Sequence, residues 1–313
     1  MPNSAEPTPA STQPDTMRWS GRAVRLLTVR HVTLYRYAEP VRFGEHRMMF
    51  RPRESHDLRL IRTRLSIQPQ PAHLCWLHDV FDNSLAVASF AGEATELRFE
   101  SVVTLEHSAA ALPDYRLEPG ARDFPFAYPA EDEPDLVRAR ERRDPDLAVD
   151  RWAARLLPAH GSVGTMDLLR AMTLRIREQL AYSHRHERGV QSPAETLRCG
   201  RGTCRDFAWL MIDAVRALGL AARFVSGYIF VPDDGAAFAL GGGATHAWLQ
   251  VYLPGAGWVD FDPTNSIIGN RNLIRVAVAW DPARVLPLCG TFIGRPGAAL
   301  GMEVSVSVTE EPD

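Results

Sequence analysis

The chain has 313 residues, enough for two domains with sizeable buried cores, and its 45% hydrophobic and 23% charged residues are typical of a soluble globular protein. Its formal net charge of −3 gives no broad attraction to phosphate backbones, so nucleic acid is not an expected partner. No segment approaches the ~18 unbroken apolar residues that a membrane helix needs, so we expect no membrane partner either.

Residues 1–20 are polar and rich in Pro, Ser, Thr and Ala. They contain no apolar core of a secretory signal, so we expect a disordered tail. The cysteines are scattered without the spacing of a disulfide framework (Cys75, Cys199, Cys204 and Cys289). Both observations favour a cytoplasmic, reduced location.

Residues 21–120 are predicted to form an antiparallel β domain. Apolar and polar residues alternate from Leu26 to Tyr37, a pattern typical of a half-buried strand, and Pro40 is expected to end that strand. Further strands are predicted over 58–67, 85–90 and 97–105, with turn residues between them. Several strands in succession without a helix indicate a sheet or a sandwich.

Residues 121–313 are predicted to form an α+β domain. Apolar residues at helical spacing predict helices over 149–157, from Thr165 as N-cap to about residue 180, and over 204–219. Strands are predicted to follow over 222–231, 246–253 and 257–261, and a last strand over 302–308.

Cys204 lies where the glycine-rich segment Gly200-Arg201-Gly202 meets the start of a predicted helix. A helix start carries N–H groups without partners inside the helix, and its positive end favours a thiolate. The same N–H groups suit the oxyanion of an acyl transfer, and we assign one such donor to the backbone of Cys204. Asp206 suits the helix dipole but opposes a second negative charge, so we assign it a structural role.

A thiolate that attacks an amide needs a proton donor and base, usually a histidine. His246 begins one predicted strand, and Asp262 ends the strand that returns from the turn Pro254–Gly257. With the turn centred near Gly255, Asp262 lies diagonally beside His246 on the neighbouring strand. A carboxylate there orients the imidazole, as in a catalytic triad. The candidate catalytic residues are therefore Cys204, His246 and Asp262.

Three segments of the chain resemble the signature blocks of the bacterial transglutaminase-like superfamily: Gly202–Ala208, Ala222–Tyr228, and His246-Ala247-Trp248 through Gly257-Trp258 to Asp262-Pro263-Thr264-Asn265. The early stretch Tyr35–Val41, with Arg51-Pro52-Arg53 and Asp79–Asn83, resembles the N-terminal β domain that accompanies this core. The likeness covers nearly the whole chain after the tail. Two positions depart from the pattern, since Asp82 stands where Gly is common and Thr203 stands where an aliphatic residue is common.

The resemblance implies a papain-like α+β transglutaminase core of helices packed on an antiparallel sheet, preceded by an antiparallel β domain. It also implies a Cys-His-Asp triad at Cys204, His246 and Asp262, with neither a cofactor nor a metal. The implied substrate is a peptide or an amide, and a weaker implication is a peptide-ligase partner of the ATP-grasp type. We expect a cysteine protease or amidase that hydrolyses its acyl-thioester. Transfer to an amine is the alternative, because both reactions share that intermediate. A non-catalytic binding or assembly protein on the same scaffold is the alternative of another class.

Other candidates carry weaker signals. His184-Arg185-His186-Glu187 has the residue types of a metal-dependent hydrolase, but a polar loop is the favoured interpretation. The glycine-rich segment Asp233–Ala244 is predicted to be a mobile loop before His246. Tyr182 is a secondary candidate for an oxyanion donor. Asp260 with Trp258 is the one pair that resembles a site for an amine acceptor.

Overall fold

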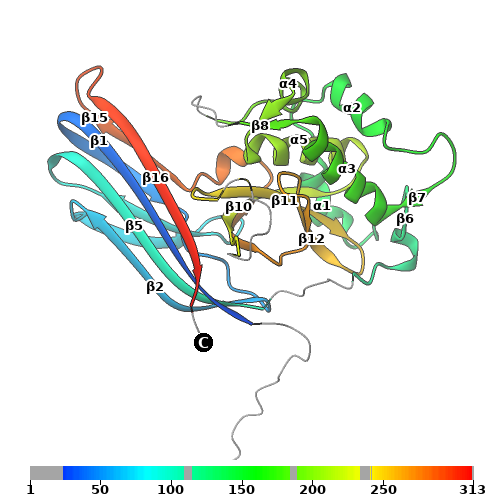
Figure 1. Ribbon diagram of the computed structural model, residues 1–313, viewed down its shortest axis with the longest axis horizontal. Coiled ribbons are helices and arrows are strands. Elements are labelled where there is room, and N and C mark those ends of the chain that lie inside the picture. Colours follow the sequence, from blue (N-terminus) through cyan, green and yellow to red (C-terminus); the bar gives the residue numbers. More distant parts are fainter. Residues whose placement is uncertain (1–23, 109–114, 184–188, 233–239, 241, 312–313) are drawn as a thin grey trace, which may run out of the picture.

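The computed structural model describes residues 24–108, 115–183, 189–232, 240 and 242–311. The chain forms a β domain and an α+β domain that lie side by side, with the concave side of the first sheet towards the second domain (Figure 1). This arrangement confirms the predicted fold class.

The first sheet has seven strands, in the order β2-β5-β1-β4-β3, with β15 and β16 also paired to β1. Its strands are β1 (Arg25–Met48), β2 (Leu58–Gln68), β3 (His73–His78), β4 (Ser84–Ser89), β5 (Glu93–His107), β15 (Leu288–Ile293) and β16 (Ala299–Glu310). The prediction that Pro40 ends the first strand is wrong. Strand β1 continues to Met48, and the registers with β5 and β16 shift near Pro40 instead, because a bulge lets a residue without an N–H stay in a strand.

The two C-terminal strands belong to the first sheet. Leu27 of β1 lies opposite Glu310 of β16, and Met48 lies opposite Leu288 of β15. The strand predicted over 302–308 is therefore present, but it belongs to the first sheet and not to the domain predicted over 121–313. Strand alternation identifies a strand but not its partner, and here the partner is distant in sequence.

The α+β domain is inserted between the strands of the first sheet. Its helices are α1 (Glu133–Arg140), α2 (Leu147–Ala154), α3 (Thr165–Gln179), α4 (Pro193–Cys199) and α5 (Cys204–Ala217). Its main sheet runs β13-β12-β11-β10-β14, with bounds β10 (Ala222–Ile229), β11 (His246–Leu253), β12 (Gly257–Asp262), β13 (Ile267–Ile268) and β14 (Leu273–Ala279). Two short pairs, β6 (Asp123–Phe124) with β7 (Val163–Gly164) and β8 (Ala181–Tyr182) with β9 (Arg201–Gly202), complete it, and single 3₁₀ turns lie at Pro119–Ala121 and Pro282–Arg284.

Helix α5 forms the centre of this domain. Its buried residues include Phe207, Leu210, Met211 and Ala214, as predicted from their spacing, and it packs on β10 and β11. Helix α3 begins at Thr165 itself, with Gly164 as its N-cap, so Thr165 is not the predicted N-cap. The Thr165 hydroxyl instead donates to the carbonyl oxygen of Ala121.

The two domains share buried polar contacts. His31 of β1 lies 3.0 Å from the hydroxyl of Tyr228 of β10 through Nδ1, and both side chains are buried. Arg275 of β14 donates to the carboxylate of Asp57, at 2.8 Å. Such contacts, together with a continuous hydrophobic core, hold the domains in a fixed relation.

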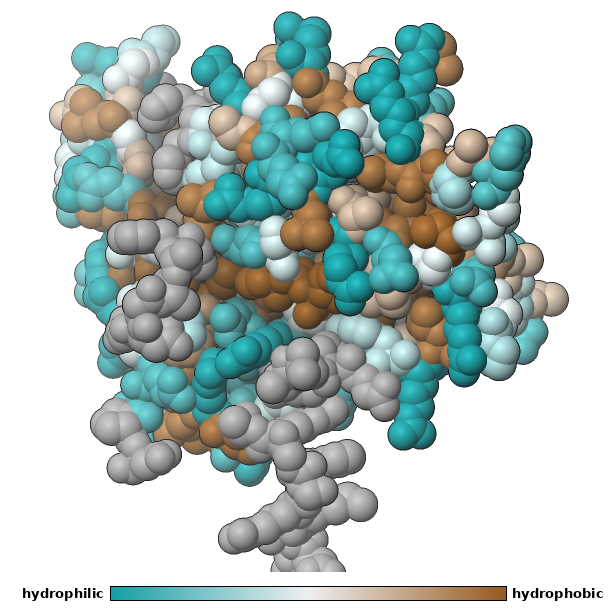
Figure 2. Space-filling view, turned by 45° about the vertical axis from the view of Figure 1, so that its right-hand side comes forward, coloured by the Kyte–Doolittle hydropathy of each residue, from teal (hydrophilic) through white to brown (hydrophobic). Residues whose placement is uncertain are grey.

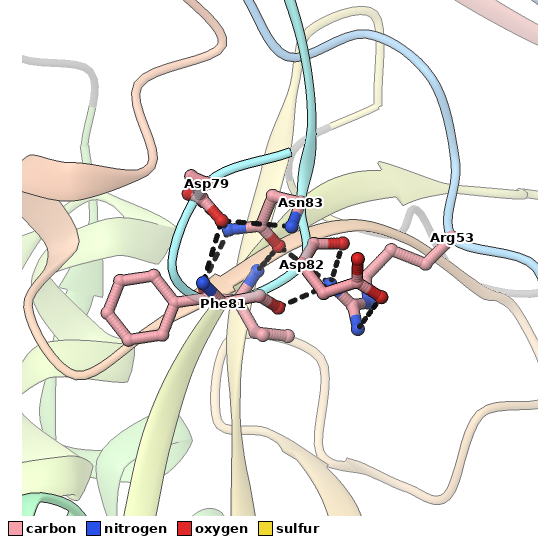
Figure 3. A network of polar contacts seen from close by, with 6 residues as sticks. Arg53, Asp79, Phe81, Asp82 and Asn83 are labelled. Carbon is pink, nitrogen blue, oxygen red and sulfur yellow. Dashed lines mark hydrogen bonds and ion pairs between the residues drawn. The ribbon is translucent and has the colours of Figure 1, made fainter. Parts of the chain in front are cut away.

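The turn Asp79–Asn83 fastens the β domain to the edge of the second sheet. The Asp79 carboxylate accepts hydrogen bonds from the backbone of Phe81 and Asn83, and Arg53 donates to the carbonyl oxygens of Phe81 and Asp82 (Figure 3). The Asn83 amide then exchanges two hydrogen bonds of 2.8 Å with the backbone of Val278 in β14. Asp82 has a φ of 60°, a left-handed conformation that Gly adopts without steric cost.

Within the described residues, no helix is long and apolar enough to cross a membrane. On the face of the molecule that brings the α+β domain forward, hydrophobic residues lie in separate patches between hydrophilic side chains (Figure 2). All four cysteines are free thiols.

Candidate active site

Cys204 is held at the first residue of α5 by a tight local structure. The preceding strand β9 pairs with β8, so that Gly202 lies beside Tyr182. A Cβ at Gly202 would lie 2.9 Å from the Cβ of Asp206, so only glycine lets the chain approach the helix so closely. Thr203 is the N-cap and forms a capping box with Asp206, which explains the departure from an aliphatic residue at position 203.

The structural role predicted for Asp206 is confirmed. Its side chain is fully buried and accepts hydrogen bonds from the backbone N–H groups of Thr203, at 2.8 Å, and Gln191, at 2.7 Å. The carboxylate therefore ties the segment before α4 to the start of α5. This fixes the backbone on which Cys204 stands.

His246 and Asp262 come from adjacent strands joined by a tight turn. The pairing of β11 with β12 places Leu249 opposite Phe261 and Leu253 opposite Gly257, which is the register predicted from a turn centred at Gly255. Beyond this ladder, His246 Nε2 lies 2.8 Å from Asp262 Oδ2, so the predicted contact is present.

The side chains of this pair are completely buried. The side chains of His246 and Asp262 have no exposed surface, and Cys204 is 6% exposed. Gly227 lies opposite His246 in β10, and a Cβ there would meet the Ile274 carbonyl oxygen at 2.1 Å. The indole of Trp248 stacks near the imidazole, with ring centroids 6.0 Å apart. The ring of His246 is thus confined to one orientation.

The electrostatics favour a charged imidazole. Burial alone would lower the pKa of His246, but the charge of Asp262 and the hydrogen bond to it, with a further contribution from Cys204, raise this pKa to about 10. Burial alone would raise the pKa of Asp262, but His246, Asn265 and the Thr264 backbone hold it below its ordinary value. At neutral pH the pair is therefore an imidazolium and a carboxylate.

Only one nitrogen of the imidazole is used by Asp262. An ionised carboxylate can only accept hydrogen bonds. Nε2 therefore carries a proton and donates a hydrogen bond to Asp262. Nδ1 is buried and makes no hydrogen bond of standard geometry to any described residue. It is therefore the nitrogen left for a proton transfer.

Thr264 and Asn265 complete the surroundings of Asp262 but were not assigned roles from sequence. The Thr264 N–H donates to Asp262 Oδ1 at 2.9 Å, and Asn265 Nδ2 donates to Asp262 Oδ2 at 2.8 Å. The Asn265 side chain also binds the backbone of Leu240 through both its atoms. Their place two and three residues after Asp262 was the one available signal, because groups so near in sequence can reach the carboxylate.

The residues with weaker sequence signals lie in different places. Tyr182 lies near the triad, since burial and then the charges of Cys204 and Asp262 raise its pKa to about 12. Asp260 is buried and accepts hydrogen bonds from Trp248 Nε1 at 2.7 Å and Arg275 Nη1 at 3.3 Å, so it is engaged in a structural network. The residues 184–187 and 233–239 lie outside the described part of the chain. In the described residues, no group of three or more His, Cys, Asp or Glu side chains could hold a metal ion.

Comparison with known proteins gives the family. Residues 27–106 match the model of the bacterial transglutaminase-like N-terminal region, and residues 158–263 match that of the transglutaminase-like superfamily core. Two relatives, the uncharacterized proteins Rv2569c of Mycobacterium tuberculosis and Mb2599c of Mycobacterium bovis, are each 31% identical over 292 residues, which cover 90% of this chain and 91% of theirs. The chain belongs to the bacterial transglutaminase-like superfamily.

A solved structure shares this transglutaminase-like fold over both domains. The crystal structure of a proposed cysteine protease from Cytophaga hutchinsonii covers 93% of this chain and 92% of its own, with a TM-score of 0.66 and 16% identity. At this identity the likeness supports the fold alone. The superfamily match also agrees with the three sequence blocks, since its core segment contains Cys204, His246 and Asp262.

Proposed function

We propose that this protein is a thiol-dependent acyl-transfer enzyme that hydrolyses a peptide or amide bond with Cys204, His246 and Asp262. The observation that carries the proposal is the buried ion pair in which Asp262 holds His246 Nε2 at 2.8 Å, while Nδ1 makes no standard hydrogen bond to a described residue. With Cys204 at the start of α5 and acting electrostatically on the same ring, Nδ1 is the nitrogen that serves the thiol.

The reaction follows from these positions. The Cys204 thiolate attacks the amide carbonyl carbon, and the oxyanion that forms is bound by the Cys204 N–H in the first turn of α5. His246 then gives its Nδ1 proton to the leaving amine, the C–N bond breaks, and an acyl-thioester remains. A water molecule attacks the thioester and gives its proton back to Nδ1. The C–S bond breaks, which releases the acid and restores the thiolate.

Asp262 acts by holding the imidazole and stabilising its charge. It keeps the proton on Nε2 and the raised pKa of His246, so the proton needed by the leaving amine is present at neutral pH. The reaction proposed needs no cofactor. A cytoplasmic location and a peptide-ligase partner of the ATP-grasp type remain parts of this proposal.

The test is a set of triad variants assayed on a library of peptides and acyl-amides for release of ammonia or amine. Cys204→Ala and His246→Ala should each lower turnover by roughly 10⁴-fold, and the double variant should be little worse than either, because the residues act as a unit. Asp262→Ala should cost less, since it orients rather than reacts. A Cys204→Ala protein that kept half of the wild-type rate would show that this mechanism is wrong, whereas a wild-type protein that turned over no member of the library would favour the non-catalytic binding or assembly role.

A further inference from the structure

Strand β16 is an edge strand of the first sheet. It pairs with β1 on one side, and no other strand of the described chain pairs with it on the other. Figure 1 shows β16 on the side of the sheet that faces the α+β domain. A free edge presents a row of backbone N–H and C=O groups that a further strand can use.

The direction of these groups follows from two backbone hydrogen bonds. The N–H of Glu311 donates to Leu26 of β1, at 2.8 Å, whereas the N–H of Val306 donates to Gly243 O, at 2.9 Å, on the opposite side. Backbone groups alternate between the two sides of an antiparallel strand, and the register with β1 is continuous from Met302 to Glu310. The N–H and C=O groups of Met302 and Val304 therefore point away from β1.

An apolar row follows the same strand. Val306 is buried in the main hydrophobic core, and Val304 and Met302 lie on the same face because they are two and four residues away. Their exposed fractions rise along the strand, from 7% at Val306 to 37% at Val304 and 56% at Met302. The core contact of Val306 thus continues outward as an apolar strip that the described residues leave partly exposed.

The other long edge of the sheet is built differently. Strand β2 carries Arg59, Arg62 and Arg64, and its register with β5 shifts at Ile61. Charges and bulges of this kind prevent an edge from pairing with another chain. We call Met302–Val304 the free stretch of β16. Glu303 is its one charged residue, and it forms an ion pair with Arg36 of β1. This edge therefore lacks the protection that β2 has.

The free stretch begins next to the candidate active site. Gly243, whose carbonyl oxygen binds Val306, precedes His246 by three residues on the same segment. A strand added beyond Gly243 continues along the line in which Gly243 already pairs with β16. A peptide docked along this edge would therefore end beside the segment that carries His246.

We propose that an extended polypeptide substrate adds to β16 as a further antiparallel or parallel strand, pairing with the backbone of Met302 and Val304. The inference rests on the proposed function, for which it names the substrate class: an unfolded or extended peptide with apolar side chains at alternate positions. Backbone pairing supplies affinity, and the row of Met302 and Val304 selects apolar residues.

A second copy of the chain fits this edge less well. Gly243 already occupies the edge at Val306, so the stretch left for two β16 strands to pair is short. Few paired residues and a narrow apolar strip bury less surface than a stable dimer needs. A peptide requires only this short stretch.

The test measures binding without catalysis, in the Cys204→Ala protein. The probe is a fluorescein-labelled peptide of about eight alternating Val and Thr residues, a usual strand length, followed by fluorescence anisotropy. Val304→Pro removes the outward N–H but no hydrogen bond to β1, whereas Val304→Thr keeps the N–H and the β-branched shape. Ile61→Lys changes an exposed apolar residue on the opposite edge and serves as the matched control.

The expected result is that Val304→Pro weakens peptide binding at least tenfold, while Val304→Thr and Ile61→Lys change it less than threefold. Hydrogen exchange at the Met302 and Val304 amides should slow when the peptide binds. Equal binding by Val304→Pro and wild type, or no binding at roughly 1 mM peptide, overturns the proposal. So does a dimer in sedimentation that Val304→Pro converts to a monomer. Edge-dependent binding together with a wild-type protein that releases no amine from any peptide would contradict the proposed function alone.

Discussion

The amide of Asn265 connects Asp262 to the segment that precedes His246. Its Nδ2 lies 2.8 Å from Asp262 Oδ2 and 3.4 Å from His246 Nε2, and its side chain also binds Leu240. Asn265 is thus a positioning residue for the triad. It acts through Asp262 and touches no reacting atom.

Replacing Asn265 by Ala should lower kcat roughly ten- to hundredfold with little change in KM, because the ion pair loses its fixed geometry. Asn265 also helps to keep the pKa of Asp262 low, so the acidic limb of the kcat profile should move to higher pH. Steady-state rates between pH 4 and pH 9 provide the measurement. Asn272→Ala is the control, and an unchanged profile in Asn265→Ala would show a role in folding alone.

Replacing Asp262 by Asn should discharge His246 at pH 8. In the wild type the pKa of His246 is raised to about 10, mainly by Asp262 against the effect of burial, and the variant leaves burial dominant. Nitrogen NMR of labelled histidine, assigned with a His246→Gln protein, should show an imidazolium only in the wild type. A neutral His246 in the wild type at pH 8 would refute the ion pair.

The ion pair of His246 and Asp262 also makes the stability of the folded protein depend on pH. Because the pKa of His246 in the folded protein lies above its unfolded value, its contribution is complete below the unfolded pKa of about 6.5 and is lost as pH rises through about 10.

Water should outcompete added amine at the acyl-thioester. Asp260, the carboxylate that with Trp258 suggested an amine site, is buried and bound to Trp248 and Arg275. The guanidinium of Arg223 covers the ring of Trp258, at 4.1 Å. With a fluorescent primary amine at ~1 mM against water at roughly 55 M, mass spectrometry should find the free acid as the main product. A dominant amine adduct would establish the transamidase instead.

Replacing Asp82 by Gly should stabilise the protein by about 0.5–1 kcal/mol, because Gly adopts the φ of 60° at Asp82 without steric cost. The Asp82 carbonyl oxygen still accepts from Arg53, and the lost ion pair is a long, exposed one at 4.0 Å. Urea unfolding gives the free energy. Asp82→Ala removes the same carboxylate but keeps the Cβ, so it should destabilise, and a stabilised Ala variant would contradict the conformational explanation.

His31 should make the domain interface sensitive to acid. Burial lowers its pKa to about 4, so the folded protein binds fewer protons than the unfolded chain between about pH 6.5 and pH 4. Stability is therefore lost as pH falls through that window, by about 3 kcal/mol in total for this group. The fall in unfolding free energy from pH 7 to pH 4.5 should be smaller in His31→Gln than in wild type. Equal falls would leave the acid response to other groups.

The sequence predicted the parts of the site that depend on local pairing. The turn at Gly255 fixes the register of β11 and β12, so the contact between His246 and Asp262 could be inferred from residue numbers. The helix start at Cys204 followed from its glycines and the apolar spacing after it. Asn265 was not found, because its role depends on the backbone of Leu240, which no local pattern places beside it.

The topology of the first sheet was harder to predict from the sequence. Alternation predicted strands near β1, β2, β4 and β5, but β3 is exposed along most of its length and carries no alternating pattern. Helices α1 and α4 have only eight and seven residues, so each is too short to show a clear helical periodicity. The partner of β16 could not be read from a pattern that only reports which residues face inward.

The pairing of β1 with β16 has a consequence for synthesis of the protein. Leu27 emerges from the ribosome early, but its neighbour opposite, Glu310, emerges only after the entire inserted domain. Until then, the part of β1 from Leu27 to Tyr37 has a strand partner on one side only, and its apolar residues there depend on β5 for shelter. The α+β domain has all strands of its own sheet by Ala279, so it can fold before the first sheet closes. A nascent chain stalled before β16 is therefore the form most prone to aggregate. It is also the form whose exposed strand a chaperone would bind.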